Sequence, residues 1–307
     1  MITRQEVSPM MVAGRYELRQ ALARGGIGEL WEGVDVRLRR PVAVKRIRGD
    51  RLTEDAVRRF NREARVMASF RHPGVAAVHD FGSDDFGLFL VMDLVEGWTV
   101  TDVLDAHDQV PVPWAALIGA QVCAVLSAAH ERSLIHRDLK PSNLMVCRDA
   151  TVVVLDFGMA TVLDSSEQSL ITGTMDRPGT DVYMAPEQIT WGRVGAATDL
   201  YAVGCVLYEM LTGRRVFEAA DPALEVRGHL EREPVRPAVL EPSVPAEVDE
   251  VVMSLLAKEP ERRPRRAEDV VRRLLPYARA LPPLPGVVDR GLRPVHLYAR
   301  AVARISW

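Results

Sequence analysis

The sequence predicts an α+β protein built from two lobes, a small lobe rich in β-strands followed by a larger helical lobe. The chain has 307 residues, which is long enough for two separate hydrophobic cores. Short stretches of apolar residues typical of strands fill most of the part before Val100, whereas apolar residues after it recur at helical spacing. This change of pattern predicts a hinge near residues 93–97.

The expected strands of the small lobe are short, and a glycine cluster and a turn at residues 84–87 separate some of them. They cover residues 16–23, 29–35, 41–47, 76–82 and 88–94. One helix interrupts them, beginning after Thr53 and running to about Phe70. Thr53 is a favourable N-cap, and Glu54 and Asp55 suit the positive end of the helix dipole.

The large lobe is expected to contain several helices and one hairpin. The main helices cover residues 114–132, 197–212 and 248–257, and the hairpin joins 144–147 to 151–155. The first helix is apolar, but Gln121 and its many small residues indicate a buried core helix rather than a membrane span. After a linker rich in proline, helical spacing predicts a terminal helix that docks on the large lobe or, less expectedly, on a partner; its apolar residues are Val295, Tyr298, Val302 and Ile305.

The bulk composition is that of an ordinary soluble protein. Hydrophobic residues make up 48% and charged residues 26%, and the net charge of −3 argues against a polyanion-binding protein. The Arg-rich stretch 262–273 includes Glu268 and Asp269 and lacks aromatic residues, so it indicates a solvated face. Three scattered cysteines and an N-terminus without an apolar core favour a cytoplasmic location. We expect no nucleic-acid partner and no membrane span.

Lysine is rare in this chain. Of its 39 Lys and Arg residues only three are lysine, namely Lys45, Lys140 and Lys258. Lysine is a compact point charge and arginine is a planar fork, so a retained lysine can mark a place where arginine does not fit. Lys45 and Lys140 both lie in segments that have a phosphoryl-transfer interpretation.

A glycine cluster supplies the first of these segments. Gly25, Gly26 and Gly28 lie between two expected strands, where glycine lets backbone N–H groups approach a phosphate closely. Such clusters more often make a plain hairpin turn, and the strand–loop–strand setting rules out a Rossmann fingerprint. The functional interpretation therefore depends on Lys45, which lies on the next strand.

The expected helix of the small lobe offers a partner for this lysine. Glu63 shares a helical face with Phe60, Ala64 and Met67. A carboxylate that faces a core is costly unless it is paired. If the helix packs on the small sheet, Glu63 is expected to pair with Lys45 and to hold its ammonium ready for phosphate oxygens.

Residues 136–143 bring together three chemically active side chains. Asp138 can orient a hydroxyl group and accept its proton, Lys140 can neutralise charge on a moving phosphoryl group, and Asn143 can ligate a divalent cation. Asp156 follows a fully apolar strand, and a carboxylate at the mouth of a buried strand is a natural Mg²⁺ ligand. Each residue alone is compatible with an ordinary loop, but their joint order and spacing make that interpretation very unfavourable.

With these residues in view, the sequence resembles the protein-kinase superfamily, and within it the bacterial Hanks-type Ser/Thr kinases. The resemblance runs from about Tyr16 to about Leu275. It rests on the glycine-rich loop at 23–28, the V-A-I-K strand at 42–45, the catalytic loop at 136–143, D-F-G at 156–158 and A-P-E at 185–187. It implies a bilobal protein-kinase-like fold and transfer of the γ-phosphate of ATP to Ser/Thr hydroxyls of protein substrates, with Mg²⁺ or Mn²⁺.

The resemblance also implies individual roles. Lys45 is expected to bind the α- and β-phosphates and to pair with Glu63. Asp138 is the expected catalytic base, assisted by Lys140. Asn143 and Asp156 are the expected metal ligands. Met92 is similar to the gatekeeper, the backbone of Asp93 and Val95 is expected to face adenine, and the apolar walls are expected to be Leu22, Leu30, Ala43 and Met145. Expected structural residues are Thr180, Asp199, and Glu187 paired with Arg263.

The segment after Asp156 is rich in Ser and Thr. Kinases with an arginine directly before the base, here Arg137, can pair it with a phosphorylated threonine that orders this segment. Thr172 and Thr174 lie where relatives carry such sites, so we expect autophosphorylation at one or both. The protein itself is then one of its own substrates.

The resulting domain organisation is an N-terminal extension at 1–14, the small lobe at 15–93, the hinge at 94–97, the large lobe at 98–278 and a helical tail at 279–307. Two other functions compete with an active kinase. A pseudokinase that serves as a binding module would lack one of the catalytic residues, and all are present. A small-molecule phosphotransferase of the same fold usually lacks Lys140 at this spacing. Ala23 and Leu30 depart from the usual Gly and Val, which is expected to adjust nucleotide affinity at most.

Overall fold

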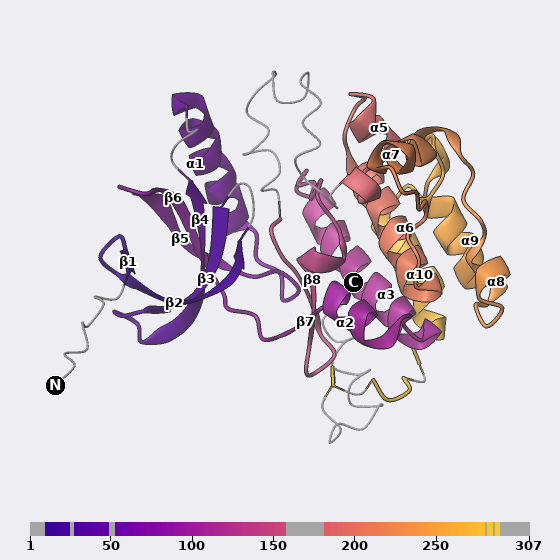
Figure 1. The fold of residues 1–307 in the computed structure, drawn as a ribbon, viewed down its shortest axis with the longest axis horizontal. Helices are drawn as coiled ribbons and strands as arrows, with labels where there is room; N and C mark the ends of the chain where they lie inside the picture. The colour runs from indigo at the N-terminus through magenta and orange to yellow at the C-terminus, as the bar shows by residue number, and fades with distance from the viewer. Residues whose placement is uncertain are drawn as a thin grey trace. The chain divides into compact units, whose positions relative to one another are not determined.

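The computed structural model describes residues 10–24, 28–48, 53–157, 181–279, 281–284 and 286–288 (Figure 1). The chain divides into two compact units, and a boundary falls between Val95 and Glu96, within the predicted hinge. The stretch 72–75 belongs to the second unit rather than the first. The reason is local, because the N–H of Val154 donates to the carbonyl of Gly74 at 2.8 Å and Val75 forms a parallel bridge with Val154.

The first unit is an antiparallel sheet in the order β1-β2-β3-β4-β6-β5 with one helix, α1 (Figure 1). The elements are β1 (Met11–Val12), β2 (Tyr16–Arg24), β3 (Gly28–Asp35), β4 (Arg40–Arg48), α1 (Glu54–Ser69), β5 (Val78–Asp84) and β6 (Gly87–Met92). A buried cluster that includes Tyr16, Val42, Val44, Phe89 and Val91 forms its core. The strands predicted from the sequence are present, and β1 is an additional edge strand that the sequence did not predict.

Helix α1 begins and ends where the sequence predicts. The hydroxyl of Thr53 accepts a hydrogen bond from the N–H of Ala56 at 3.1 Å, which caps the first turn. Ala56, Phe60 and Ala64 form the buried stripe of the helix, and the Phe60 ring meets the Phe81 ring of β5 edge-on at 6.3 Å. The helix therefore packs against β5 through residues spaced four apart.

Strands β5 and β6 are shorter than the predicted runs at the end near the hinge. β6 stops at Met92, because Asp93 leaves the ladder and bonds Ala77 through both its backbone and its side chain. The N–H of Asp93 donates to the Ala77 carbonyl at 3.0 Å, and the Ala77 N–H donates to the Asp93 carboxylate at 3.0 Å. The Asp93 carboxylate thus takes the place of a backbone carbonyl at the end of the ladder.

The second unit is mainly helical (Figure 1). Its helices are α2 (Val100–His107), α3 (Val112–His130), α5 (Pro186–Ile189), α6 (Ala196–Thr212), α7 (Pro222–Glu231), α8 (Pro237–Leu240), α9 (Ala246–Leu255) and α10 (Ala267–Leu274). A small sheet in the order β7-β8-β9 joins Gly97–Thr99, Leu144–Cys147 and Val152–Val154. The predicted hairpin is the β8–β9 pair.

Helix α3 lies at the centre of the second unit, with α6 and α10 packed on it. A Cβ at Gly119 of α3 would come within 2.8 Å of Leu207 and 3.0 Å of Leu274, so glycine permits this close approach. By length and composition α3 could cross a membrane, but 78% of its most apolar window is buried within the protein. It is the buried core helix that the sequence predicts, while the predicted terminal helix lies outside the described residues.

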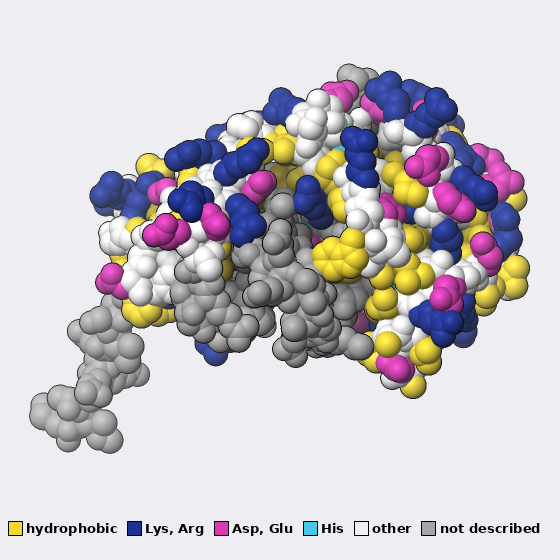
Figure 2. Space-filling view, turned by 90° about the horizontal axis from the view of Figure 1, so that it is seen from above, with side chains coloured by type: hydrophobic (Ala, Val, Ile, Leu, Met, Phe, Trp, Pro, Cys, Tyr) yellow, Lys and Arg dark blue, Asp and Glu magenta, His cyan; other side chains and the backbone are white. Residues whose placement is uncertain are grey.

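The Arg-rich stretch near α10 pairs with acidic neighbours. Arg266 lies 2.8 Å from Glu268, and Arg272 lies 2.9 Å from Asp269. On the face shown in Figure 2, basic and acidic side chains are interspersed. Arg263 is the exception in this stretch, because its side chain is fully buried.

Candidate active site

Strand β4 of the first unit carries Lys45 and Ala43 on the face opposite to the buried Val42 and Val44. Leu30 of β3 and Leu90 of β6 stand beside Lys45, and Met92 stands beside Ala43. Residues directly opposite each other in an antiparallel sheet share a face. The sheet therefore gathers several predicted site residues on one surface: Leu30, Ala43, Lys45 and Met92.

The glycine-rich segment is described only at its ends, because Gly25 and Gly26 lie outside the described residues. A Cβ at Gly28 would come within 1.9 Å of the Arg46 carbonyl, so the close approach of β3 and β4 requires glycine there. Leu22 lies at an irregularity of the β2–β3 register and is 45% exposed. For Gly28 the structure thus gives a packing reason in addition to the predicted phosphate contact.

Glu63 does not form the expected ion pair. Among the residues that the structure describes, no ion pair or hydrogen bond joins it to Lys45, and its side chain is only half-buried. The sequence argument placed Glu63 in the core, but the buried stripe of α1 runs through Ala56, Phe60 and Ala64, and Glu63 lies at its margin. A carboxylate at the margin is solvated and does not need a partner.

In the second unit, the predicted catalytic loop follows α3 and ends in the 3₁₀ turn Pro141–Asn143, which directly precedes β8. The Lys140 ammonium lies 3.1 Å from the Asp138 carboxylate. The amide nitrogen of Asn143 donates to the Asp138 carbonyl at 2.7 Å and to its carboxylate at 3.3 Å. The three residues that the sequence singled out therefore form one cluster around the Asp138 carboxylate.

A buried carboxylate from α6 fixes the backbone of this loop. Asp199 is 1% exposed and accepts hydrogen bonds from the N–H groups of His136 and Arg137, each at 2.9 Å. His130, at the end of α3, donates to the same carboxylate at 2.8 Å. Arg137 adopts a φ of 68°, a left-handed conformation that these bonds help to hold. Sequence reasoning missed His130, because a lone histidine at a helix end carries no signal of its own.

The imidazole of His136 links the loop to the segment after β9. Its Nδ1 accepts from the N–H of Asp138 at 3.3 Å, so its Nε2 carries the proton that is donated to the Leu155 carbonyl at 2.9 Å. Its ring also meets Phe157 edge-on at 4.8 Å. These contacts fix the backbone on both sides of Asp156, which itself adopts a φ of 54°.

The residues present suit a magnesium ion. The N–H of Leu155 donates to the carbonyl of Asn143 at 2.8 Å, which holds Asp156 close to the loop. Because the nitrogen of Asn143 is committed to Asp138, its amide oxygen is left for a cation. No group of three or more His, Cys, Asp or Glu residues able to hold a metal ion occurs in the described parts of the chain. Mg²⁺ binds one or two protein oxygens together with substrate phosphates, and the oxygens of Asn143 and Asp156 could serve as those ligands.

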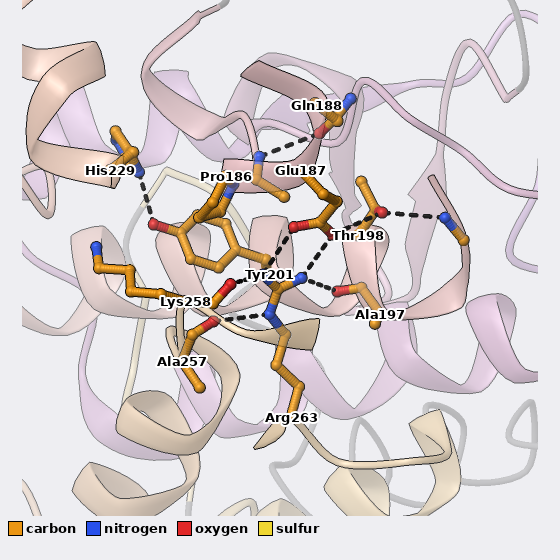
Figure 3. Close-up of polar contacts among 12 residues, drawn as sticks. Pro186, Glu187, Gln188, Ala197, Thr198, Tyr201, His229, Ala257, Lys258 and Arg263 are labelled. Atoms are coloured by element: carbon orange, nitrogen blue, oxygen red, sulfur yellow. Dashed lines mark hydrogen bonds and ion pairs between the residues drawn. The ribbon is translucent and has the colours of Figure 1, made fainter. Parts of the chain in front are cut away.

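A second buried ion pair stabilises the segment after the catalytic loop (Figure 3). Arg263 binds both carboxylate oxygens of Glu187, at 2.7 and 2.8 Å, as the resemblance implies. Thr198 donates to Glu187 at 2.8 Å. Burial disfavours ionisation, but the hydrogen bonds from Arg263, the backbone and Thr198 together hold the pKa of Glu187 below its usual range.

The third lysine has a structural role that the sequence did not indicate. Lys258 donates to the Gly228 carbonyl of α7 at 3.2 Å, and its ammonium lies 4.5 Å from the centre of the Phe217 ring (Figure 3 shows its position). Burial lowers its pKa to about 8. His229 of α7 is buried beside it and shares a hydrogen bond of 2.8 Å with the hydroxyl of Tyr201. Lys258 thus secures the end of α7.

The remaining predicted residues fall into two groups. Met145 lies on β8 between Thr99 and Val153, and Val95 is half-buried at the end of the first unit. Thr172, Thr174 and Thr180 lie outside the described residues. Their predicted roles stay predictions.

A β-rich unit with a lysine on its central strand, and a helical unit with an Asp–Lys–Asn loop, define the class of two-lobed phosphotransferases. Comparison with known proteins gives the same result. Residues 16–274 match the protein kinase domain family, and the chain therefore belongs to that family.

Three curated relatives show the similarity in detail. The chain is 36% identical to the probable serine/threonine-protein kinase SCO3848 of Streptomyces coelicolor, over 85% of this chain and 40% of the relative. It is 34% identical to the serine/threonine-protein kinase PknB of Mycobacterium leprae, over 90% of this chain and 45% of the relative. For the probable serine/threonine-protein kinase CE0033 of Corynebacterium efficiens the identity is 38%, over 81% and 39%. The chain thus spans less than half the length of these relatives.

Proposed function

We propose that the protein is a serine/threonine kinase that transfers the γ-phosphate of ATP to hydroxyl groups of protein substrates. The observation that carries the proposal is the cluster around the Asp138 carboxylate, with Lys140 at 3.1 Å and the Asn143 amide on the Asp138 backbone. A base for a hydroxyl proton, a cation for the phosphoryl group and a neutral oxygen ligand are the parts that phosphoryl transfer needs. The names of the relatives support serine and threonine as acceptors.

In the proposed mechanism the protein supplies position and charge. The Asp138 carboxylate orients the substrate hydroxyl and accepts its proton, and Lys140 neutralises charge that develops on the transferred group. Lys45 binds the α- and β-phosphates, with Glu63 as its expected partner once nucleotide is bound. A bound Mg²⁺ or Mn²⁺ supplies further charge neutralisation at the phosphates, and Asn143 and Asp156 are the residues that would hold it. The double anchor of the loop on Asp199 means that little reorganisation is needed for the reaction.

Regulation is proposed to act through the segment after Asp156. Phosphate on Thr172 or Thr174 would add negative charge that Arg137 can bind. The Arg137 carbonyl accepts from Gln188 of α5 at 2.9 Å, so its backbone is already tied to the segment that follows. We propose a signalling enzyme of the cytoplasm that phosphorylates itself as well as other proteins.

The test is transfer of radiolabelled phosphate from ATP by the wild type and by Asp138→Asn, with mapping of the labelled sites. The amide cannot accept the proton, and the label should fall at least about a hundredfold. Asp269→Asn, on the surface of α10, is the matched control and should label normally. Equal labelling of wild type and Asp138→Asn would sink the catalytic assignment.

A further inference from the structure

Strand β5 carries an extra residue directly before the hinge. In the β5–β6 ladder, Val78 pairs with Met92 and Asp80 pairs with Val91, so two residues of β6 face three of β5. His79 is the additional residue of this β-bulge. A bulge disturbs the strict alternation of a strand and redirects the side chain at the bulged position.

The redirected His79 side chain binds the carboxylate of Asp93. Its Nε2 donates to one oxygen of Asp93 at 2.7 Å, while the other oxygen accepts from the N–H of Ala77 at 3.0 Å. The N–H of Asp93 donates to the Ala77 carbonyl at 3.0 Å. The His79 side chain is 14% exposed and that of Asp93 is 47% exposed. The pair therefore lies at the surface, with His79 mostly shielded from solvent. Three hydrogen bonds therefore fix Asp93, one to His79 of β5 and two to Ala77 directly before this strand.

Asp93 directly follows Met92, whose register places it beside Ala43 of β4. Met92 and Ala43 are each 6% exposed. These are residues of the proposed adenine pocket, and the backbone of Asp93 is proposed to present a carbonyl to the base. The direction of that carbonyl is set by the backbone torsions of Asp93, which its tethered N–H and carboxylate restrict. An unrestrained Asp93 would have to be ordered at a cost in affinity when a nucleotide binds.

We propose that His79 is a positioning residue for nucleotide recognition, which holds Asp93 so that its backbone presents a fixed hydrogen-bonding edge to adenine. This inference rests on the proposed function. It assigns to His79 an effect on the affinity for adenine nucleotides and on the preference for ATP over GTP. It assigns no effect on the phosphoryl-transfer step or on the affinity for the protein substrate.

The experiment compares His79→Leu, His79→Gln and Asp93→Ala with wild type. His79→Leu removes the donor, whereas the amide nitrogen of His79→Gln can donate from nearly the same place as Nε2. The dissociation constants of Mg-ADP and Mg-ATP are measured by titration calorimetry, and kcat and the KM values for ATP, GTP and a protein substrate are measured by phosphate transfer. Asp84→Asn is the matched control, because Asp84 lies at the far end of β5 and pairs with Arg46 at 3.5 Å.

In His79→Leu and Asp93→Ala, the nucleotide dissociation constant and KM for ATP should rise about threefold to tenfold, the net worth of one ordinary hydrogen bond. kcat and KM for the protein substrate should stay within about twofold of wild type. His79→Gln should regain most of the affinity, and the double variant His79→Leu/Asp93→Ala should be no weaker than either single variant. The preference for ATP over GTP should fall in both single variants.

Several results would overturn the inference. Nucleotide affinity within about twofold of wild type in folded His79→Leu and Asp93→Ala would do so. An equal loss in kcat and in the KM for the protein substrate would do so too, because it would indicate a general structural role. If His79→Leu does not fold, the half-exposed Asp93→Ala carries the test. A wild type that binds nucleotide without transferring phosphate refutes the proposed function alone, since calorimetry still decides on His79. A wild type that binds no nucleotide refutes both.

Discussion

The two units hold their polar site residues in different ways. In the helical unit, charged groups that are almost fully buried each make several hydrogen bonds: Asp199, which fixes the backbone directly before Asp138, accepts three, and Arg263, which holds Glu187, donates five. In the β-rich unit, Lys45 and Glu63 are half-buried and their positions follow from strand register and one helix. Buried, fully bonded networks have few alternative arrangements, whereas half-exposed side chains have many.

The difference suggests a division of tasks. The catalytic loop is organised before any ligand arrives, because its backbone bonds do not depend on one. The side chains of the β-rich unit are half-exposed, and the pairing of Lys45 with Glu63 stays a prediction for the nucleotide-bound protein. Variants that disrupt the buried networks of Asp199 and Arg263 should therefore cost mainly stability, whereas a variant at Lys45 of the β-rich unit should cost mainly function.

The largest effect on stability is expected at Arg263. Arg263→Met leaves Glu187 buried without its partner, and the free energy of unfolding should fall by about 3–5 kcal/mol. Urea unfolding measures this loss. Arg266→Met is the matched control, because Arg266 pairs with Glu268 at the surface and is 63% exposed; its effect should stay within about 0.5 kcal/mol. Similar losses in both variants would show that the buried network is no more important than a surface pair.

An acid-dependent loss of stability is expected from the same region. Burial, and next to it the charge of Lys258, lowers the pKa of His229 to about 4. The folded protein then binds fewer protons at His229 than the unfolded chain between about pH 6.5 and pH 4. The contribution of His229 to the free energy of unfolding should thus be constant above this window and should fall by about 3 kcal/mol as the pH drops through it.

His229→Asn isolates this contribution, since its amide can keep the hydrogen bond to Tyr201 but does not titrate. Unfolding by urea at several pH values should give a shallower acid slope for the variant than for wild type. Other carboxylates titrate in the same window, so the difference between the two proteins is the decisive quantity. Identical slopes would contradict the role of His229.

Much of this organisation can be predicted from sequence because it depends on local patterns. The strands of the first unit and helix α1 follow from apolar spacing and from the Thr53 cap. The cluster of Asp138, Lys140 and Asn143 follows from residues that are near neighbours in the chain. The pairing of Glu187 with Arg263 joins distant residues and came only from the family resemblance.

The features that the sequence did not predict depend on how deeply a side chain is buried or on the register of a strand. Helical periodicity gives the direction of Glu63 on α1 but not how deeply that edge is buried, and its pairing with Lys45 stays a prediction. The bulge at His79 adds one residue to a strand, which no alternation pattern marks in advance. Single-turn helices such as α5 and α8 are too short to show a period at all.

The β-rich unit is tested most directly by Lys45→Arg. The change keeps the positive charge but replaces a compact ammonium by a planar guanidinium. Because Leu30 and Leu90 lie beside Lys45, the larger guanidinium is expected to place its charge at a different position from the ammonium. kcat/KM should fall about a hundredfold or more, which corresponds to about 2.7 kcal/mol of transition-state stabilisation, while stability changes little. Arg46→Lys is the control in the reverse direction, since Arg46 lies on the other face of β4, and its activity should stay within about threefold. Near-normal turnover in Lys45→Arg would mean that this unit needs only a positive charge at the position, and the retention of lysine in a chain with 39 Lys and Arg residues would lose its functional meaning.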